Sequence, residues 1–153
     1  MYQGRHDEVD PTVVILHGMG GSGKTQLALK YCRQSMDTQR HNSIFWVDAS
    51  TPKTTAQSFA AIEGLIFNCK VDLSNAEASV RRVVAEMSKW QTAWLIVFDN
   101  FDEPSLFDDE GKNIRDYFPR GKRGSILFTT RNEGTGRLGH MIEANRIDRK
   151  SVV

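Results

Sequence analysis

Short apolar runs alternate with amphipathic segments along most of this chain. The runs are rich in β-branched and aromatic residues and have the length of strands buried on both faces, as in a parallel sheet. They lie at residues 13–17, 44–48, 94–98, 125–130 and 140–143, and the last is the weakest. The pattern therefore predicts a sheet of about five parallel strands.

Between these runs, apolar residues recur at the three- and four-residue spacing of a helix. The first predicted helix starts at Lys24 and ends near residue 35, and the second carries an apolar stripe at Phe59, Ile62 and Ile66. The third is marked by apolar positions at Val80, Val83, Val84 and Met87. Strands alternating with helices predict an α/β fold in which helices cover both faces of the sheet.

Several residues are candidates for ending or starting helices. We expect Ser50 to cap the second helix, with Pro52 in its first turn. Ser74 and Glu77 have the spacing of a capping box before the third helix. The polar segment 101–119 predicts a loop with one short helix around residues 112–118.

Composition narrows the class of protein. The chain has 153 residues, of which 39% are hydrophobic and 25% charged, and its net charge is +1. Such a balance gives no electrostatic reason to expect nucleic acid or a membrane as a partner. The two cysteines form no metal-ligand cluster, and the N-terminus has no apolar signal sequence. We therefore expect residues 1–153 to form a single cytoplasmic domain.

The loop after the first strand carries the strongest chemical signal. Residues 18–25 match the phosphate-binding pattern G-x-x-x-x-G-K-[ST], in which glycines let backbone N–H groups wrap a phosphate. Lys24 is expected on the β- and γ-phosphates and Thr25 on Mg²⁺. A strand before the loop and a helix after it argue against a chance match. The expected nucleotide-binding residues are Gly18, Gly20, Gly21, Ser22, Gly23, Lys24, Thr25 and Gln26.

Two further strand ends carry candidate residues, since ligands bind beyond the carboxyl ends of parallel strands. Asp99 ends an apolar run, which is the place of the Walker-B aspartate that holds Mg²⁺. Arg131 follows the fourth strand, where a guanidinium can meet the γ-phosphate. A solubilising aspartate and a surface arginine are the alternatives. Together with the glycine loop, these positions predict a three-layer P-loop NTPase fold.

The group that would activate water is less defined. Asn100 stands where many hydrolases have a second acid, and an amide is not a base. Asp102 and Glu103 are the nearby carboxylates that we expect to orient or activate water. An equally weighted alternative is that both only cap the loop before Pro104.

Four blocks of sequence point to a known family: VVILHGMGGSGKTQLALKY, IFWVDAS, WLIVFDNFDEP and GSILFTTRN. They resemble, in the family order, the nucleotide-binding subdomain of NB-ARC proteins. These are signal-transduction ATPases of the STAND class, found in plant resistance proteins and NOD-like receptors of innate immunity. FWVDAS and FDNFDEP are most similar to the fungal NOD-like receptors.

The resemblance implies a role for each matching position. Lys24 and Thr25 match the family's phosphate and magnesium positions, Asp99 its Walker-B acid and Arg131 its first sensor arginine. Gly4-Arg5 resembles a motif that lies against adenine, so Arg5 joins the expected nucleotide-binding residues, although His6 replaces the following acid. The implied ligands are Mg²⁺ and ATP or ADP.

Family members continue into helical and winged-helix subdomains that clamp ADP. The sequence stops at Val153 before either, as an excised fragment or as a naturally short member, and the absence of a purification tag favours the second. Without that clamp we expect an open site with modest affinity, weak base selectivity and free release of product.

Three functions remain in competition. The first is a slow Mg²⁺-dependent NTPase, and the second is a non-hydrolysing module that pairs with a full-length receptor. Weak self-association through neighbouring nucleotide domains is also expected from the resemblance. The third is a small-molecule kinase with Arg131 and Arg137 in a lid, against which the FDNFDEP and GSILFTTRN blocks argue. A GTPase is disfavoured, because the segment after Asp99 lacks the glycine of the D-x-x-G turn.

Overall fold

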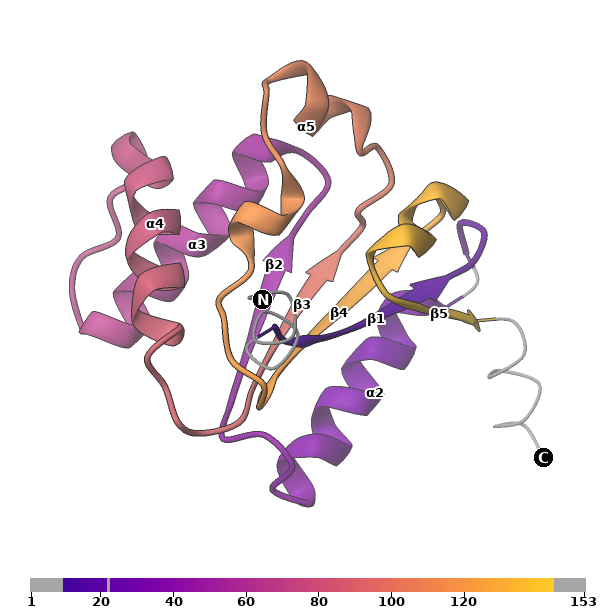
Figure 1. The fold of residues 1–153 in the computed structure, drawn as a ribbon, viewed down its shortest axis with the longest axis horizontal. Helices are drawn as coiled ribbons and strands as arrows, with labels where there is room; N and C mark the ends of the chain where they lie inside the picture. Colours follow the sequence, from indigo (N-terminus) through magenta and orange to yellow (C-terminus); the bar gives the residue numbers. More distant parts are fainter. Residues whose placement is uncertain (1–9, 22, 145–153) are drawn as a thin grey trace, which may run out of the picture.

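A wholly parallel five-stranded sheet forms the middle layer of the domain (Figure 1). The computed structural model describes residues 10–21 and 23–144. The strand order across the sheet is β2-β3-β4-β1-β5. The strands are β1 (Thr12–His17), β2 (Ser43–Asp48), β3 (Trp94–Asp99), β4 (Gly124–Thr130) and β5 (His140–Glu143). Each predicted strand is confirmed to within one residue at either end.

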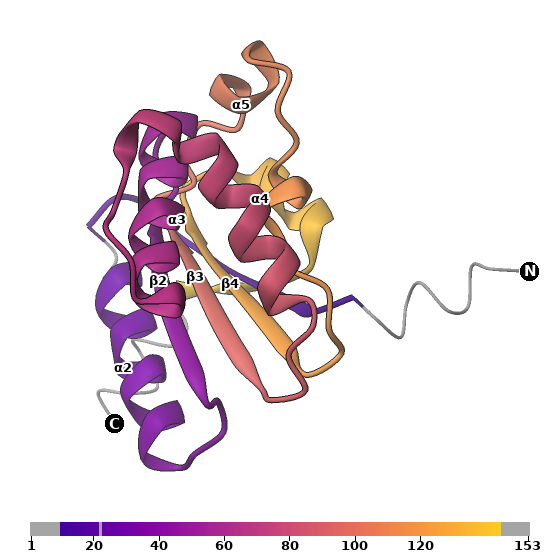
Figure 2. The same ribbon diagram turned by 90° about the vertical axis from the view of Figure 1, so that its left-hand side faces the viewer.

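Helices cover both faces of this sheet, as the alternating pattern predicted. On one face lies α2 (Lys24–Asp37), and on the other lie α3 (Pro52–Phe67) and α4 (Ala76–Met87) (Figures 1 and 2). The two faces of β3 show why its whole length is apolar. Ile96 and Phe98 pack in the core on the α3 and α4 side, whereas Leu95 and Val97 pack with α2. This is the three-layer arrangement of a P-loop NTPase.

The helix starts differ in part from the expected caps. Thr51, and not Ser50, caps α3. The Thr51 hydroxyl accepts from the Thr54 backbone N–H at 3.0 Å, and the Thr54 hydroxyl accepts from the Thr51 backbone N–H at 3.1 Å. Pro52 lies in the first turn as predicted. The capping box at Ser74 and Glu77 is wrong.

The residue that precedes α4 is Asn75, which makes no side-chain cap. The Glu77 carboxylate instead accepts from Lys112 Nζ at 2.6 Å, and the Ser74 backbone N–H binds Asp72 at 3.0 Å. Asp72 thereby caps the short 3₁₀ helix η1 (Leu73–Asn75). Asp72, an acceptor nearer in the chain, and Lys112, a donor distant in the chain, therefore take the places of the two expected partners.

The segment after β3 contains more structure than the pattern predicted. A short helix α5 (Ser105–Asp109) precedes the 3₁₀ helix η2 (Ile114–Tyr117), which replaces the expected helix around residues 112–118. Phe107 and Tyr117 are buried there against the aromatic core. A third 3₁₀ helix, η3 (Glu133–Leu138), follows β4. No helix in the described part of the chain combines the length and apolarity needed to cross a bilayer.

Candidate nucleotide-binding site

The glycine loop joins β1 to α2 at the carboxyl edge of the sheet. The Gly18 N–H donates to the Thr130 carbonyl at 3.1 Å, which ties the start of the loop to β4. Gly21 and Gly23 have φ values of 80° and 82°, a left-handed backbone that side chains other than glycine rarely adopt. The residue that precedes α2 is Gly23, which has no side chain with which to cap the helix. The first backbone N–H groups of α2 are therefore available to an anion.

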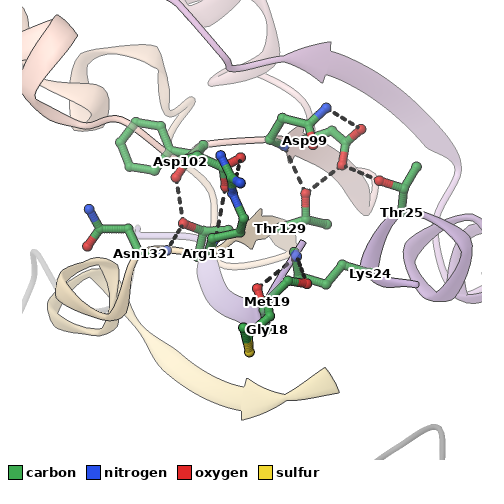
Figure 3. Close-up of polar contacts among 12 residues, drawn as sticks. Gly18, Met19, Lys24, Thr25, Asp99, Asp102, Thr129, Arg131 and Asn132 are labelled. Carbon is green, nitrogen blue, oxygen red and sulfur yellow. Dashed lines mark hydrogen bonds and ion pairs between the residues drawn. The ribbon is translucent and has the colours of Figure 1, made fainter. Parts of the chain in front are cut away.

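Lys24 is the first residue of α2, and its side chain folds back along the loop (Figure 3). Its Nζ donates to the carbonyls of Gly18 at 2.8 Å and Met19 at 2.9 Å. The residue is only 8% exposed. This burial is the main cause that lowers the pKa of Lys24 from its ordinary value, while the carboxylate of Asp102 acts in the opposite direction. A buried ammonium at the loop is the arrangement that phosphate binding needs.

Asp99, at the end of β3, brings together side chains from three elements (Figure 3). Its Oδ1 accepts from Thr25 Oγ1 of α2 at 3.1 Å and from Thr129 Oγ1 of β4, and its Oδ2 accepts from Asn100 Nδ2 at 3.3 Å. Thr25 and Asp99, the two predicted metal ligands, are therefore adjacent. Both present oxygen, which suits Mg²⁺, an ion usually held by one or two protein groups plus waters and phosphates.

A sharp turn at Asn100 follows Asp99. Asn100 has φ 63°, and its backbone N–H donates to Thr129 Oγ1 at 2.8 Å. Thr129 thus contacts both residues of the turn. No motif in the sequence points to Thr129. Its hydroxyl becomes significant only because β4 lies beside β3, and the sequence does not state that strand order.

Arg131 and Asp102 form an ion pair at the rim of the loop (Figure 3). The Arg131 Nε lies 3.2 Å from Asp102 Oδ2, and its backbone N–H donates to Asp102 Oδ1 at 2.8 Å. The Arg131 side chain also lies across the glycine loop, since a Cβ added to Gly20 would be 3.5 Å from its Cδ and Nη1. The Arg131 side chain remains 57% exposed. These contacts bring two of the predicted catalytic residues together beside the loop.

A cavity of about 360 Å³ lies between the loop, the start of α2 and the turn after β3. Its lining residues are Gly20, Gly21, Gly23, Lys24, Thr25, Gln26, Asn100, Asp102 and Arg131. Glu103 is exposed and does not line it. Larger hollows lie beside α2 and between α5 and η3, but neither contains the glycine loop or Asp99. Arg5 and Ser22 lie outside the described residues.

Comparisons with known proteins identify relatives over most of the chain. The NB-ARC domain model matches residues 3–146. A nucleotide-binding leucine-rich repeat (NLR)-like protein of Hyaloscypha variabilis is 30% identical over 140 residues, which covers 82% of this chain and 14% of that protein. The disease susceptibility protein LOV1 of Arabidopsis thaliana is 27% identical over 124 residues, covering 81% of this chain and 13% of that protein. The chain thus spans about one seventh of the curated relatives' length.

Among solved structures, a chain in the structure of Drosophila ORC bound to GC-rich DNA and Cdc6 superposes with a TM-score of 0.53. It covers 94% of this chain and 52% of that one at 12% identity, a likeness that shows the fold alone. The family match extends over nearly the whole chain and includes the glycine loop, Asp99 and Arg131. The chain belongs to the NB-ARC family of nucleotide-binding P-loop domains.

Proposed function

We propose that this domain binds a nucleoside triphosphate, ATP before others, together with Mg²⁺, and hydrolyses it slowly in the cavity at the glycine loop. The observation that carries the proposal is the contact between Thr25 Oγ1 and Asp99 Oδ1, which lie 3.1 Å apart beside the buried Lys24. Two oxygen ligands and a cation next to a left-handed glycine loop form a triphosphate site.

Each residue has a distinct task in this proposal. The loop N–H groups and the start of α2 wrap the phosphates. Lys24 exchanges the carbonyl oxygens of Gly18 and Met19 for phosphate oxygens, which are stronger acceptors because they are charged. Thr25 and Asp99 hold Mg²⁺, which neutralises charge on the phosphates. Thr129 keeps the Asp99 carboxylate in place.

Arg131 and Asp102 would act on the γ-phosphate and on water, respectively. In the structure they bind each other, so a γ-phosphate competes with Asp102 for the guanidinium. Release of Asp102 then leaves a carboxylate on the cavity wall to orient water. Turnover is expected to be slow, because Asn100 cannot accept a proton and Asp102 must first lose its partner. Glu103, outside the cavity, is the weaker candidate.

A non-hydrolysing module is the second candidate function. The Asp102–Arg131 ion pair favours it, since it occupies the carboxylate nearest the cavity. In that case nucleotide binding would only prepare the domain to pair with a full-length receptor or with itself. Cys32 and Cys69 are both free thiols, which suits the cytoplasmic location that we propose for either function.

Removal of the Lys24 ammonium tests the proposal. In Lys24→Ala we expect the affinity for ATP to fall at least roughly tenfold and phosphate release to reach background, because a charge-assisted contact to the phosphates is lost. The matched control is Lys30→Ala, an exposed lysine of the same helix that does not line the cavity. Calorimetry and a phosphate-release assay, with and without Mg²⁺, measure both quantities.

The outcomes separate the two functions. Phosphate release that is equal in Lys24→Ala and in the unmodified chain would show a contaminating activity and defeat the NTPase proposal. Binding that depends on Lys24 but yields no phosphate above background would establish the non-hydrolysing module.

A further inference from the structure

His17 is the last residue of β1 and directly precedes Gly18, the first residue of the glycine loop. The strands on either side of it are β4 and β5. In the register of the sheet it is opposite Thr130 on β4 and Glu143 on β5. Its side chain is 12% exposed. The imidazole is therefore enclosed at the point where three strands end at the candidate site.

Both ring nitrogens of His17 face hydrogen-bond acceptors. Nδ1 lies 3.3 Å from Glu143 Oε1, and Nε2 lies 3.2 Å from the backbone carbonyl oxygen of Arg131. A carbonyl oxygen only accepts, so the N–H of Nε2 donates to the Arg131 carbonyl, while Nδ1 faces the Glu143 carboxylate. The ring therefore links the residue after β4 to the end of β5.

We propose that His17 is a positioning residue that holds the Arg131 backbone against the end of β1. The inference rests on the proposed function, in which Arg131 meets the γ-phosphate. Asp102 binds the Arg131 N–H at 2.8 Å, and His17 binds the carbonyl of the same residue. Arg131 is thus held on both sides of its Cα. The sensor arginine and the glycine loop then move as one unit, since His17 adjoins Gly18.

The test compares ATP with ADP, because only ATP carries the γ-phosphate that Arg131 is proposed to meet. In His17→Gln we expect ATP affinity to fall roughly tenfold and ADP affinity to stay within about twofold, since a displaced guanidinium loses a charge-assisted contact. Glu143→Gln replaces the carboxylate beside Nδ1 by a neutral amide, which weakens the hold on the ring and should change the ratio in the same direction. His140→Gln, an exposed histidine on β5, is the control and should leave both affinities unchanged.

Calorimetry with ATP and with ADP measures the ratio of the two affinities for the unmodified chain and for each variant. An unchanged ratio, or an equal loss for ATP and ADP as expected of a purely structural role, would overturn the inference. If His17→Gln does not fold, Glu143→Gln decides in the same way. If the unmodified chain binds neither ATP nor ADP, both the proposed function and this inference are overturned. If the unmodified chain binds both nucleotides and the variants keep the same ratio of affinities, only this inference is overturned.

Discussion

Thr129 shows how much one hydroxyl can organise at the residue scale. The side chain is fully buried, with 0% exposure. Its Oγ1 donates to Asp99 Oδ1 and accepts from the Asn100 N–H at 2.8 Å. A single hydroxyl therefore orients the carboxylate beside Thr25 and satisfies the backbone of the left-handed turn. Its loss would leave the buried Asp99 carboxylate and the Asn100 N–H without this partner.

Thr129→Val keeps the shape of the side chain and removes the hydroxyl. We expect the free energy of unfolding to fall by about 1–3 kcal/mol, the usual cost of leaving a buried polar partner unsatisfied. Thr129→Ser keeps the hydroxyl and should lose less. Urea denaturation of the three proteins measures the difference. Equal stability of the valine and serine variants would show that the hydroxyl contacts do not stabilise the turn.

At the scale of elements, α2 is fastened to the sheet at both ends. Lys24 and Thr25 bind at its start, to the glycine loop and to Asp99. Near its end, Ser35 bonds to Nδ1 of His41, and Nε2 of His41 lies 3.2 Å from Ser125 Oγ of β4. Burial, and secondly the charge of Arg40, lowers the pKa of His41 from its ordinary value of 6.5. A buried neutral imidazole thus links the end of α2 to the amino end of β4, opposite the carboxyl ends of the strands where the glycine loop lies.

This pKa shift predicts how stability depends on pH. The unfolded chain takes up a proton at a higher pH than folded His41 does, so acid favours unfolding. The stability that neutral His41 contributes should be complete above pH 6.5 and be lost as the pH falls through the lower folded pKa. The gap in unfolding free energy between the unmodified chain and His41→Asn should therefore narrow from pH 7 to pH 5.

Urea denaturation at several pH values measures this gap. His140→Asn, at an exposed position, should show no such change. A gap that is independent of pH would contradict the neutral, buried state of His41.

At the scale of the whole molecule, the described residues build the side of the candidate site where we propose that the phosphates bind. The cavity is lined by the glycine loop, the start of α2, Asn100, Asp102 and Arg131, and none of these lining residues is aromatic. Within residues 10–21 and 23–144, the cavity wall thus offers no ring on which a base would stack. Arg5, the expected base contact, lies outside the described part.

Weak base selectivity follows from this one-sided site. We expect ATP and GTP to bind with affinities within about tenfold of each other, because strong discrimination needs hydrogen-bonding groups built around the base. Competition calorimetry with ATP, GTP and ADP measures the ratio. Binding of ATP alone, with no measurable GTP binding, would show that the chain contains a base pocket.

Local patterns in the sequence were sufficient for much of the fold and for part of the site. Apolar runs located the strands, and the spacing of glycines and Lys24 picked out the glycine loop of the candidate site, because both signals arise within a few neighbouring residues. Asp99 and Arg131 became candidates in the same way, from their places directly after apolar runs. The helix caps were less predictable, as Thr51 and Asp72 lie one or two positions from equally suitable residues.

The remaining contacts were decided by the order of the strands. Thr129 meets Asp99 because β4 lies beside β3, and His17 meets Glu143 because β1 lies between β4 and β5. The Asp102–Arg131 pair likewise joins residues that are 29 positions apart. Sequence alone determined which residues carry charge and which strands they end. Only the tertiary structure decided which of them touch, since contacts between distant segments depend on packing of the whole sheet and not on local spacing.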